Sequence, residues 1–84
     1  MKGFYVDLKR DTRFALLAGP FPDEATARKY ERAAVKLAQE LDPWAAFDPF
    51  GVMSIDTKTD KLPLGKLNDR LAIEPGDLMQ MEEA

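Results

Sequence analysis

The chain has 84 residues, with 12 basic and 15 acidic side chains and a net charge of −3. A hydrophobic fraction of 45% beside a charged fraction of 32% is typical of one small globular domain and excludes a disordered segment. The sequence has no cysteine and no histidine, so it lacks disulfides, thiolate nucleophiles, the commonest catalytic base and the commonest metal ligand. The acidic balance argues against binding to duplex nucleic acid, because phosphate neutralisation requires an excess of basic residues.

The first 19 residues predict two strands joined by a short polar loop. Residues 3–9 alternate between apolar and polar side chains, which is the pattern of a half-buried strand, and Tyr5 falls on its solvent face. Residues 14–19 are apolar at nearly every position, so we expect a more deeply buried strand there, central in the sheet. The first strand is then expected nearer an edge, and the second is expected to stop at Gly19–Pro22, because proline cannot donate to a ladder.

The stretch 23–41 carries the strongest periodic signal. Its apolar residues recur at spacings of three and four and form one stripe, as expected of an amphipathic helix: Ala27, Tyr30, Ala34, Leu37 and Leu41. Asp42-Pro43 ends this helix, because a residue before proline avoids the helical region.

The remaining elements complete an α+β fold. One short helical turn is expected over residues 43–47 and a third strand over 52–56, before a polar turn at Thr57–Lys61. The order β-β-α-β predicts a small antiparallel sheet, with strands at about 3–9, 14–19 and 52–56, and one long helix, at about 23–41, packed on one face.

The domain is expected to span residues 1–68, followed by an acidic tail at 69–84 that is either docked or mobile. The tail mixes acidic residues with leucine and methionine, so it could imitate nucleic acid or enter a basic groove, although such tails commonly serve solubility.

Two resemblances bear on function. The segment Leu16–Arg28, LLAGPFPDEATAR, resembles the strand, Gly-Pro-Phe turn and helix of SPOR domains, and this resemblance implies binding to peptidoglycan glycan. SPOR domains have a second helix and a periplasmic address, and neither is visible here. Over residues 4–68, the Gly-Pro-Phe turn, the alanine-rich helix, Asp42–Ala45 and Phe47–Val52 resemble small uncharacterised proteins of phages and integrative elements of proteobacteria. That resemblance implies a genetic context in which anti-CRISPR inhibitors occur, and it transfers no catalytic residues.

Three aromatic side chains between two Asp-Pro steps are the main candidate for partner binding: Trp44, Phe47 and Phe50. Aromatic residues dominate interface energies, and these three are difficult to hide beneath one helix. Two alternatives stay open, namely that they complete the core or that they form the seam of a homodimer.

A second candidate is the polar face of the helix, where Arg28, Arg32 and Lys36 form a basic stripe with Val35 among them. We include Arg28, Arg32 and Val35 as candidate partner-binding residues at the rim of the aromatic site. The alternative is an ordinary solvated face, because acidic residues interleave with the basic ones.

Two groups of carboxylates are candidates for an acid pair or a Mg²⁺ site: Asp42, Asp48 and Asp56 as one group, and Asp7 with Asp11 as another. Their spacing matches no known metal loop, and Asp-Pro steps are ordinary turn chemistry. We therefore expect no catalytic residue, no metal and no cofactor.

The sequence predicts a non-catalytic, cytoplasmic protein-binding module without a membrane segment. We expect an accessory protein of a phage or mobile element, which binds a host protein complex and inhibits it by occlusion, as anti-CRISPR proteins do. The alternative is a module that binds glycan or single-stranded nucleic acid through the sheet face, with Tyr5 exposed for stacking.

Overall fold

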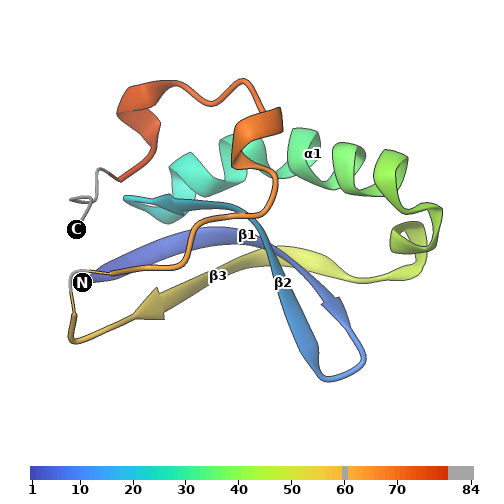
Figure 1. Ribbon diagram of the computed structural model, residues 1–84, viewed down its shortest axis with the longest axis horizontal. Coiled ribbons are helices and arrows are strands. Elements are labelled where there is room, and N and C mark those ends of the chain that lie inside the picture. Colours follow the sequence, from blue (N-terminus) through green and yellow to red (C-terminus); the bar gives the residue numbers. More distant parts are fainter. Residues whose placement is uncertain (60, 80–84) are drawn as a thin grey trace.

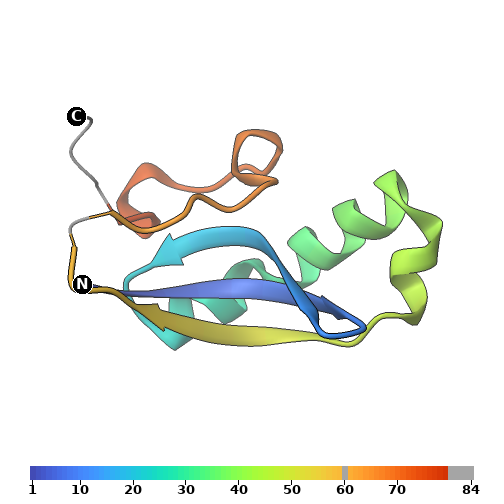
Figure 2. The same ribbon diagram turned by 60° about the horizontal axis from the view of Figure 1, so that its bottom comes forward.

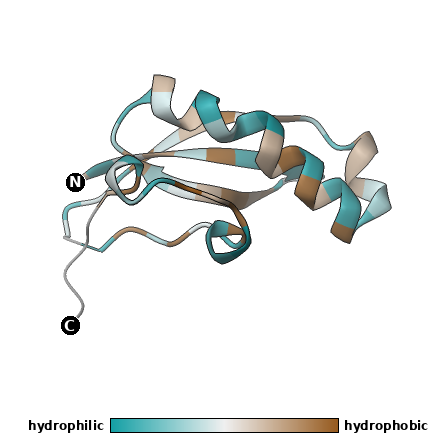
Figure 3. Cartoon of the chain, turned by 90° about the horizontal axis from the view of Figure 1, so that it is seen from above, coloured by the Kyte–Doolittle hydropathy of each residue, from teal (hydrophilic) through white to brown (hydrophobic). Residues whose placement is uncertain are grey.

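A computed structural model describes residues 1–59 and 61–79 of the chain, and it confirms the α+β fold. In chain order the elements are β1 (Lys2–Arg10), β2 (Arg13–Phe21), α1 (Glu24–Leu41), the 3-10 helix η1 (Pro43–Phe47) and β3 (Phe50–Asp56), followed by the 3-10 turns η2 (Asn68–Arg70) and η3 (Pro75–Asp77). The three strands form one antiparallel sheet, and α1 lies across one of its faces (Figure 1). Seen from above, α1 crosses the strands at an angle, with hydrophilic and hydrophobic residues alternating along it (Figure 3).

The helix begins and ends close to its predicted bounds, because local signals mark both ends. Asp23 caps the N-terminus, where its side chain accepts a 2.7 Å hydrogen bond from the amide of Thr26. The helix ends at Leu41, directly before the Asp42-Pro43 step.

The expected strand order is wrong. The sheet order is β2-β1-β3, so β1 is the central strand and β2 is an edge strand. This explains why β2 continues through Pro20 to Phe21 rather than stopping at Gly19. An edge strand tolerates proline, because no neighbouring strand needs its missing N–H on the outer side.

The second face of the sheet is partly covered, which overturns the expected exposure of Tyr5. The segment after β3 returns over this face near β2 (Figure 2), and Tyr5 is fully buried. The hydroxyl of Tyr5 donates a 2.7 Å hydrogen bond to the carbonyl of Pro63, and Leu62 is buried as well. Tyr5 is therefore a core residue and is not available for base or sugar stacking.

The same C-terminal segment covers the free edge of β2. The amides of Gly65, Lys66 and Leu67 donate to the carbonyls of Gly19, Leu16 and Leu17 at 2.8–2.9 Å. Further along, the amide of Met79 donates to the carbonyl of Pro20 at 2.9 Å. These bonds satisfy backbone groups that an edge strand otherwise presents to solvent.

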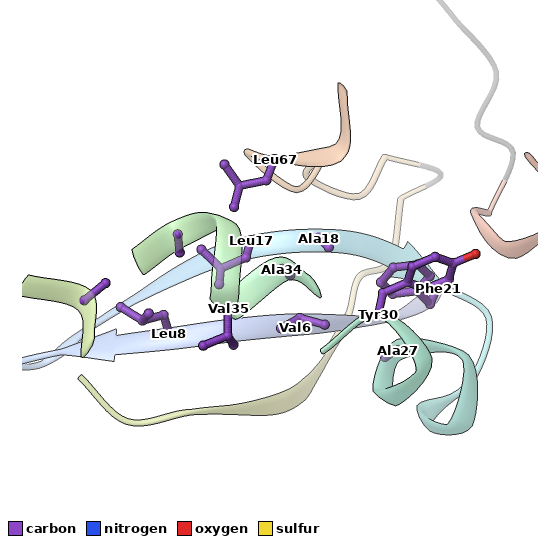
Figure 4. Close-up of a cluster of buried hydrophobic side chains, with 12 residues drawn as sticks. Val6, Leu8, Leu17, Ala18, Phe21, Ala27, Tyr30, Ala34, Val35 and Leu67 are labelled. Atoms are coloured by element: carbon purple, nitrogen blue, oxygen red, sulfur yellow. The ribbon is translucent and has the colours of Figure 1, made fainter. Parts of the chain in front are cut away.

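The main core lies between α1 and the sheet (Figure 4). At one end, the rings of Phe21 and Tyr30 stack in parallel with their centroids 5.2 Å apart. Leu67 joins the core from the C-terminal segment, and Leu71, Ile73 and Leu78 pack against it. The described part of the predicted tail, residues 69–79, is therefore docked, whereas the acidic Glu82 and Glu83 lie outside the described residues.

Candidate protein-binding surface

Arg10 ties the end of the β1–β2 hairpin to the segment that follows α1. Its Nε donates to Oδ2 of Asp48 at 2.8 Å, and its Nη2 lies 2.7 Å from the same oxygen. The same Nη2 donates to Oδ2 of Asp42 at 2.9 Å. One guanidinium thus holds the carboxylates of both Asp-Pro steps, which lie on either side of η1.

The two aspartates also order η1 itself. Oδ1 of Asp42 accepts a 3.1 Å hydrogen bond from the amide of Trp44, so Asp42 caps the first turn while its second oxygen binds Arg10. The hydrogen bond from Arg10 lowers the pKa of Asp42, which keeps this carboxylate charged. At the other end, the amide of Asp48 donates to the carbonyl of Ala45, which closes the turn.

Between Asp42 and Asp48, which Arg10 binds, two aromatic side chains of η1 point into solvent. Trp44 is 73% exposed and Phe47 is 80% exposed, while Ala45 between them is buried against the core. The two rings contact each other, with centroids 5.9 Å apart and planes tilted by 44°. We refer to Trp44 and Phe47 as the aromatic pair; in this chain they do not complete the core.

Phe50 lies apart from the aromatic pair in its contacts. It stands at the start of β3 and lines a shallow hollow of about 200 Å³ together with Phe14 and Lys9. The Nζ of Lys9 lies 5.6 Å from the centroid of the Phe14 ring. The three predicted anchors are all at least half exposed, but ring contact joins only Trp44 and Phe47.

A larger groove, which we call the hairpin groove, opens between the β1–β2 hairpin, the last turn of α1 and residues 66–67. Its volume is about 660 Å³, within the usual range for ligand pockets. Apolar side chains from four parts of the fold line it: Leu8, Leu17, Ala38, Leu41, Ala45 and Leu67. Leu41 is 52% exposed, so apolar surface continues from the groove onto the end of α1.

Basic side chains border the hairpin groove. Arg10, Arg13 and Lys66 line it, together with the acidic Asp11 and Asp42. Arg10 and Asp42 are paired with each other, whereas no ion pair is recorded for Arg13 or Lys66 within the described residues. Asp11 forms no ion pair among the described residues either, so the residues that line the groove carry three positive and two negative charges, a net charge of +1, beside an apolar floor.

Sequence reasoning did not find this groove, because its residues are scattered over the chain. The only local signal was the pair of Asp-Pro steps, which marks η1 but not the hairpin opposite it. The β1–β2 turn holds Asp11 at a φ of 56°, a conformation that aspartate tolerates better than most residues.

The helix residues proposed as a rim lie elsewhere. Arg28 and Arg32 are exposed in the first half of α1, whereas the groove and η1 adjoin its last turn. Arg28 forms ion pairs of 3.6 Å with Glu24 and with Glu31 on the same helix. Val35 is only 6% exposed and belongs to the core, so its expected place on a polar face is wrong. The sheet extends far enough beneath α1 to cover this valine as well.

The candidate acid pairs of the described residues stay apart from one another. Within residues 1–59 and 61–79, no group of three acidic side chains is placed to hold a metal ion. Asp42 and Asp48 come together only through Arg10. Asp7 is 6% exposed, and burial is the main cause that raises its pKa, with the nearby charge of Glu31 adding to the effect.

Comparison with known proteins gives no match to a family model, a curated protein or a solved structure. In the described part of the chain, none of the helices combines the length and apolar character needed to cross a membrane.

Proposed function

We propose that this chain is a non-catalytic protein-binding domain, and that the aromatic pair and the hairpin groove form its contact surface. The observation that carries the proposal is the exposure of Trp44 and Phe47 on a helical turn held at both ends by Arg10. Large aromatic side chains held in water have an unfavourable hydration free energy that a partner can relieve.

The rigidity of η1 supports this assignment. Tryptophan is enriched among the residues that carry most of an interface's binding energy. Because Asp42 and Asp48 fix the turn through Arg10, little conformational freedom of the backbone would be lost on binding. Preorganisation of this kind increases affinity without adding contacts.

The hairpin groove indicates the chemistry of the partner. Its floor is apolar, and beyond the Arg10–Asp42 pair its border carries Arg13, Lys66 and the single acid Asp11, which leaves a net positive charge. A partner segment with apolar side chains and nearby carboxylates would complement both features. Such a segment would also meet fewer like charges than a basic one.

Occlusion of a partner requires only a complementary surface and no catalytic residue. The narrower form of the proposal is an accessory protein of a phage or mobile element that inhibits a host defence complex, as anti-CRISPR proteins do. The resemblance over residues 4–68 supports this form, and the exposed aromatic pair is consistent with it.

Site-specific photo-crosslinking tests the proposal. A photoreactive amino acid would replace Phe47 in one variant and Gly76, in η3, in another. After expression in a proteobacterial host, we expect the Phe47 variant to crosslink one defined protein that the Gly76 variant does not capture. Trp44→Ala on the Phe47 background should reduce that product at least about tenfold, as the loss of a dominant interface residue does.

Equal crosslinking from positions 47 and 76 would contradict the proposal, as would a product that is unaffected by Trp44→Ala. A charge reversal separates the contribution of the groove. Arg13→Glu with Lys66→Glu should slow association with the identified partner and weaken its salt dependence, because rim charges act mainly on the association rate.

A further inference from the structure

The two edge strands of the sheet, β2 and β3, differ in the backbone hydrogen bonds on their outer sides. The outer side of β2 is covered by the amides of Gly65–Leu67 and Met79. On the other border, β3 pairs with β1 on its inner side (Figure 2). Among the described residues, no backbone hydrogen bond from another segment reaches its outer side.

The register shows which backbone groups point outward. The amide of Lys9 donates to the carbonyl of Pro49, and the amide of Thr57 donates to the carbonyl of Met1, so both ends of the β1–β3 ladder are bonded pairs. Bonded and non-bonded pairs alternate along an antiparallel ladder. It follows that every second residue of β3 directs its N–H and C=O away from β1: Phe50, Val52, Ser54 and Asp56.

This border lacks the usual protection against strand pairing. Natural edge strands are commonly short or carry lysine, proline or a bulge. The seven residues of β3, Phe50–Asp56, contain no lysine and no proline, and their register against β1 is continuous. The strand is therefore suited to receive another strand.

We propose that the occupant of this border is β3 of a second copy of the chain, paired antiparallel about a two-fold axis at Met53. In this register Val52 of one copy faces Ser54 of the other, and Phe50 faces Asp56. All four outward-directed residues of each copy then find bonding partners. The result is a continuous six-stranded sheet with one α1 helix from each copy on the same face.

The charges beside this border are compatible with a second copy. The acidic side chain within β3 is Asp56, and the two-fold axis places it opposite Phe50 rather than opposite its own copy. The exposed flank of α1 carries both signs, with Glu24 and Glu31 beside Arg28. A surface of mixed sign does not repel its own copy.

Sedimentation velocity over a wide concentration range tests the proposal with the purified full chain. The wild type should form a reversible dimer. Ser54→Pro removes an outward N–H without touching the bonds to β1, so we expect a folded monomer, with dimerisation weakened at least roughly tenfold. Ser54→Ala keeps that N–H and serves as the matched control, which should dimerise as the wild type does.

A second variant keeps the test decisive if Ser54→Pro does not fold. Met53→Lys would place two like charges opposite each other at the axis and should also give a monomer. Amide exchange adds a local readout, since Val52 and Ser54 should exchange more slowly as the protein concentration rises.

A wild type that remains monomeric throughout would overturn the proposal, and so would a dimer that survives both variants. Trp44→Ala separates this inference from the proposed function. It should leave the dimer intact, and a dimer that depends on Trp44 would assign self-association to the aromatic pair instead.

Discussion

The hydroxyl of Tyr30 donates a hydrogen bond to Oδ2 of Asp77, 47 residues further along the chain. The same hydroxyl accepts a 3.1 Å hydrogen bond from the amide of Glu74, and Nζ of Lys29 lies 3.0 Å from Oδ2 of Asp77. Together these contacts fasten η3 and its neighbours to the first half of α1. One phenol, itself stacked on Phe21, therefore makes two of the hydrogen bonds that dock residues 74–79, beside the bond of Met79 to Pro20 and the packing of Leu78.

Tyr30→Phe should loosen this segment around Glu74 and Asp77 without opening the main core. The ring remains and can still stack on Phe21, whereas the donor to Asp77 and the acceptor for Glu74 are lost. We expect faster amide exchange at Glu74 and Asp77, with little change in the amides of β1. Unchanged exchange at Glu74 would show that apolar contacts alone hold the segment.

The same contact makes docking dependent on pH. The hydrogen bond from Tyr30, followed by the one from Lys29, lowers the pKa of Asp77 below its ordinary value. The stabilisation is therefore present above the ordinary carboxyl pKa of about 3.9 and is lost as the pH falls through the lowered pKa of the folded state. An NMR titration of the Asp77 carboxyl carbon should show this lowered pKa, and Tyr30→Phe should move it back toward the ordinary value.

Asp7 should behave in the opposite way. Its carboxyl is buried, and burial raises its pKa, so the folded state binds the proton more tightly than the unfolded state does. The associated stability is present below about pH 3.9 and is lost as the pH rises through the raised pKa. Asp7→Asn should therefore raise the free energy of unfolding at neutral pH, with a smaller effect in acid. Urea unfolding at both pH values tests this, with the exposed Asp11→Asn as the control.

Two glycines in the C-terminal segment provide a matched pair of substitutions. A Cβ on Gly65 would lie 2.5 Å from Cα of Ala18, so Gly65→Ala must push the segment away from β2. We expect a loss of about 1–3 kcal/mol, the usual range for overpacking. A Cβ on Gly76 would meet no atom within 4 Å, so Gly76→Ala should be neutral or stabilising by up to about 1 kcal/mol. Similar destabilisation of both variants in urea unfolding would contradict the close contact at Gly65.

Two aromatic residues of opposite exposure test the placement of the candidate surface. Trp44 is 73% exposed, and Trp44→Ala should change the free energy of unfolding by no more than about 0.5 kcal/mol. Phe21 is fully buried, and Phe21→Ala should cost about 3–5 kcal/mol. Circular dichroism can follow both variants, because it does not depend on the tryptophan that one of them lacks. A large loss for Trp44→Ala would place this side chain in the core.

The parts of the fold that follow local rules could be predicted from the sequence. The helix was found to within one residue, since its apolar spacing and the capping Asp23 are both local features. The burial of Tyr5 could not be found, because its hydroxyl partner Pro63 lies 58 residues away in a stretch without periodicity. Val35 was misplaced for a related reason, since its polar neighbours on the helix do not reveal how wide the sheet beneath it is.

For the candidate surface, the sequence identified the aromatic side chains but not what holds them outward. Arg10 lies 32 residues before Asp42 and 38 before Asp48, and nothing in its local context marks it as their partner. The hairpin groove is likewise a product of tertiary packing.

The hydrogen bonds of Gly65–Leu67 along β2 have a consequence for assembly size. In a six-stranded sheet built about Met53, both outermost strands would be β2, and each would already be sealed by its own chain. The assembly would stop at two copies instead of growing into a fibre, because Gly65–Leu67 would block the addition of further strands to β2.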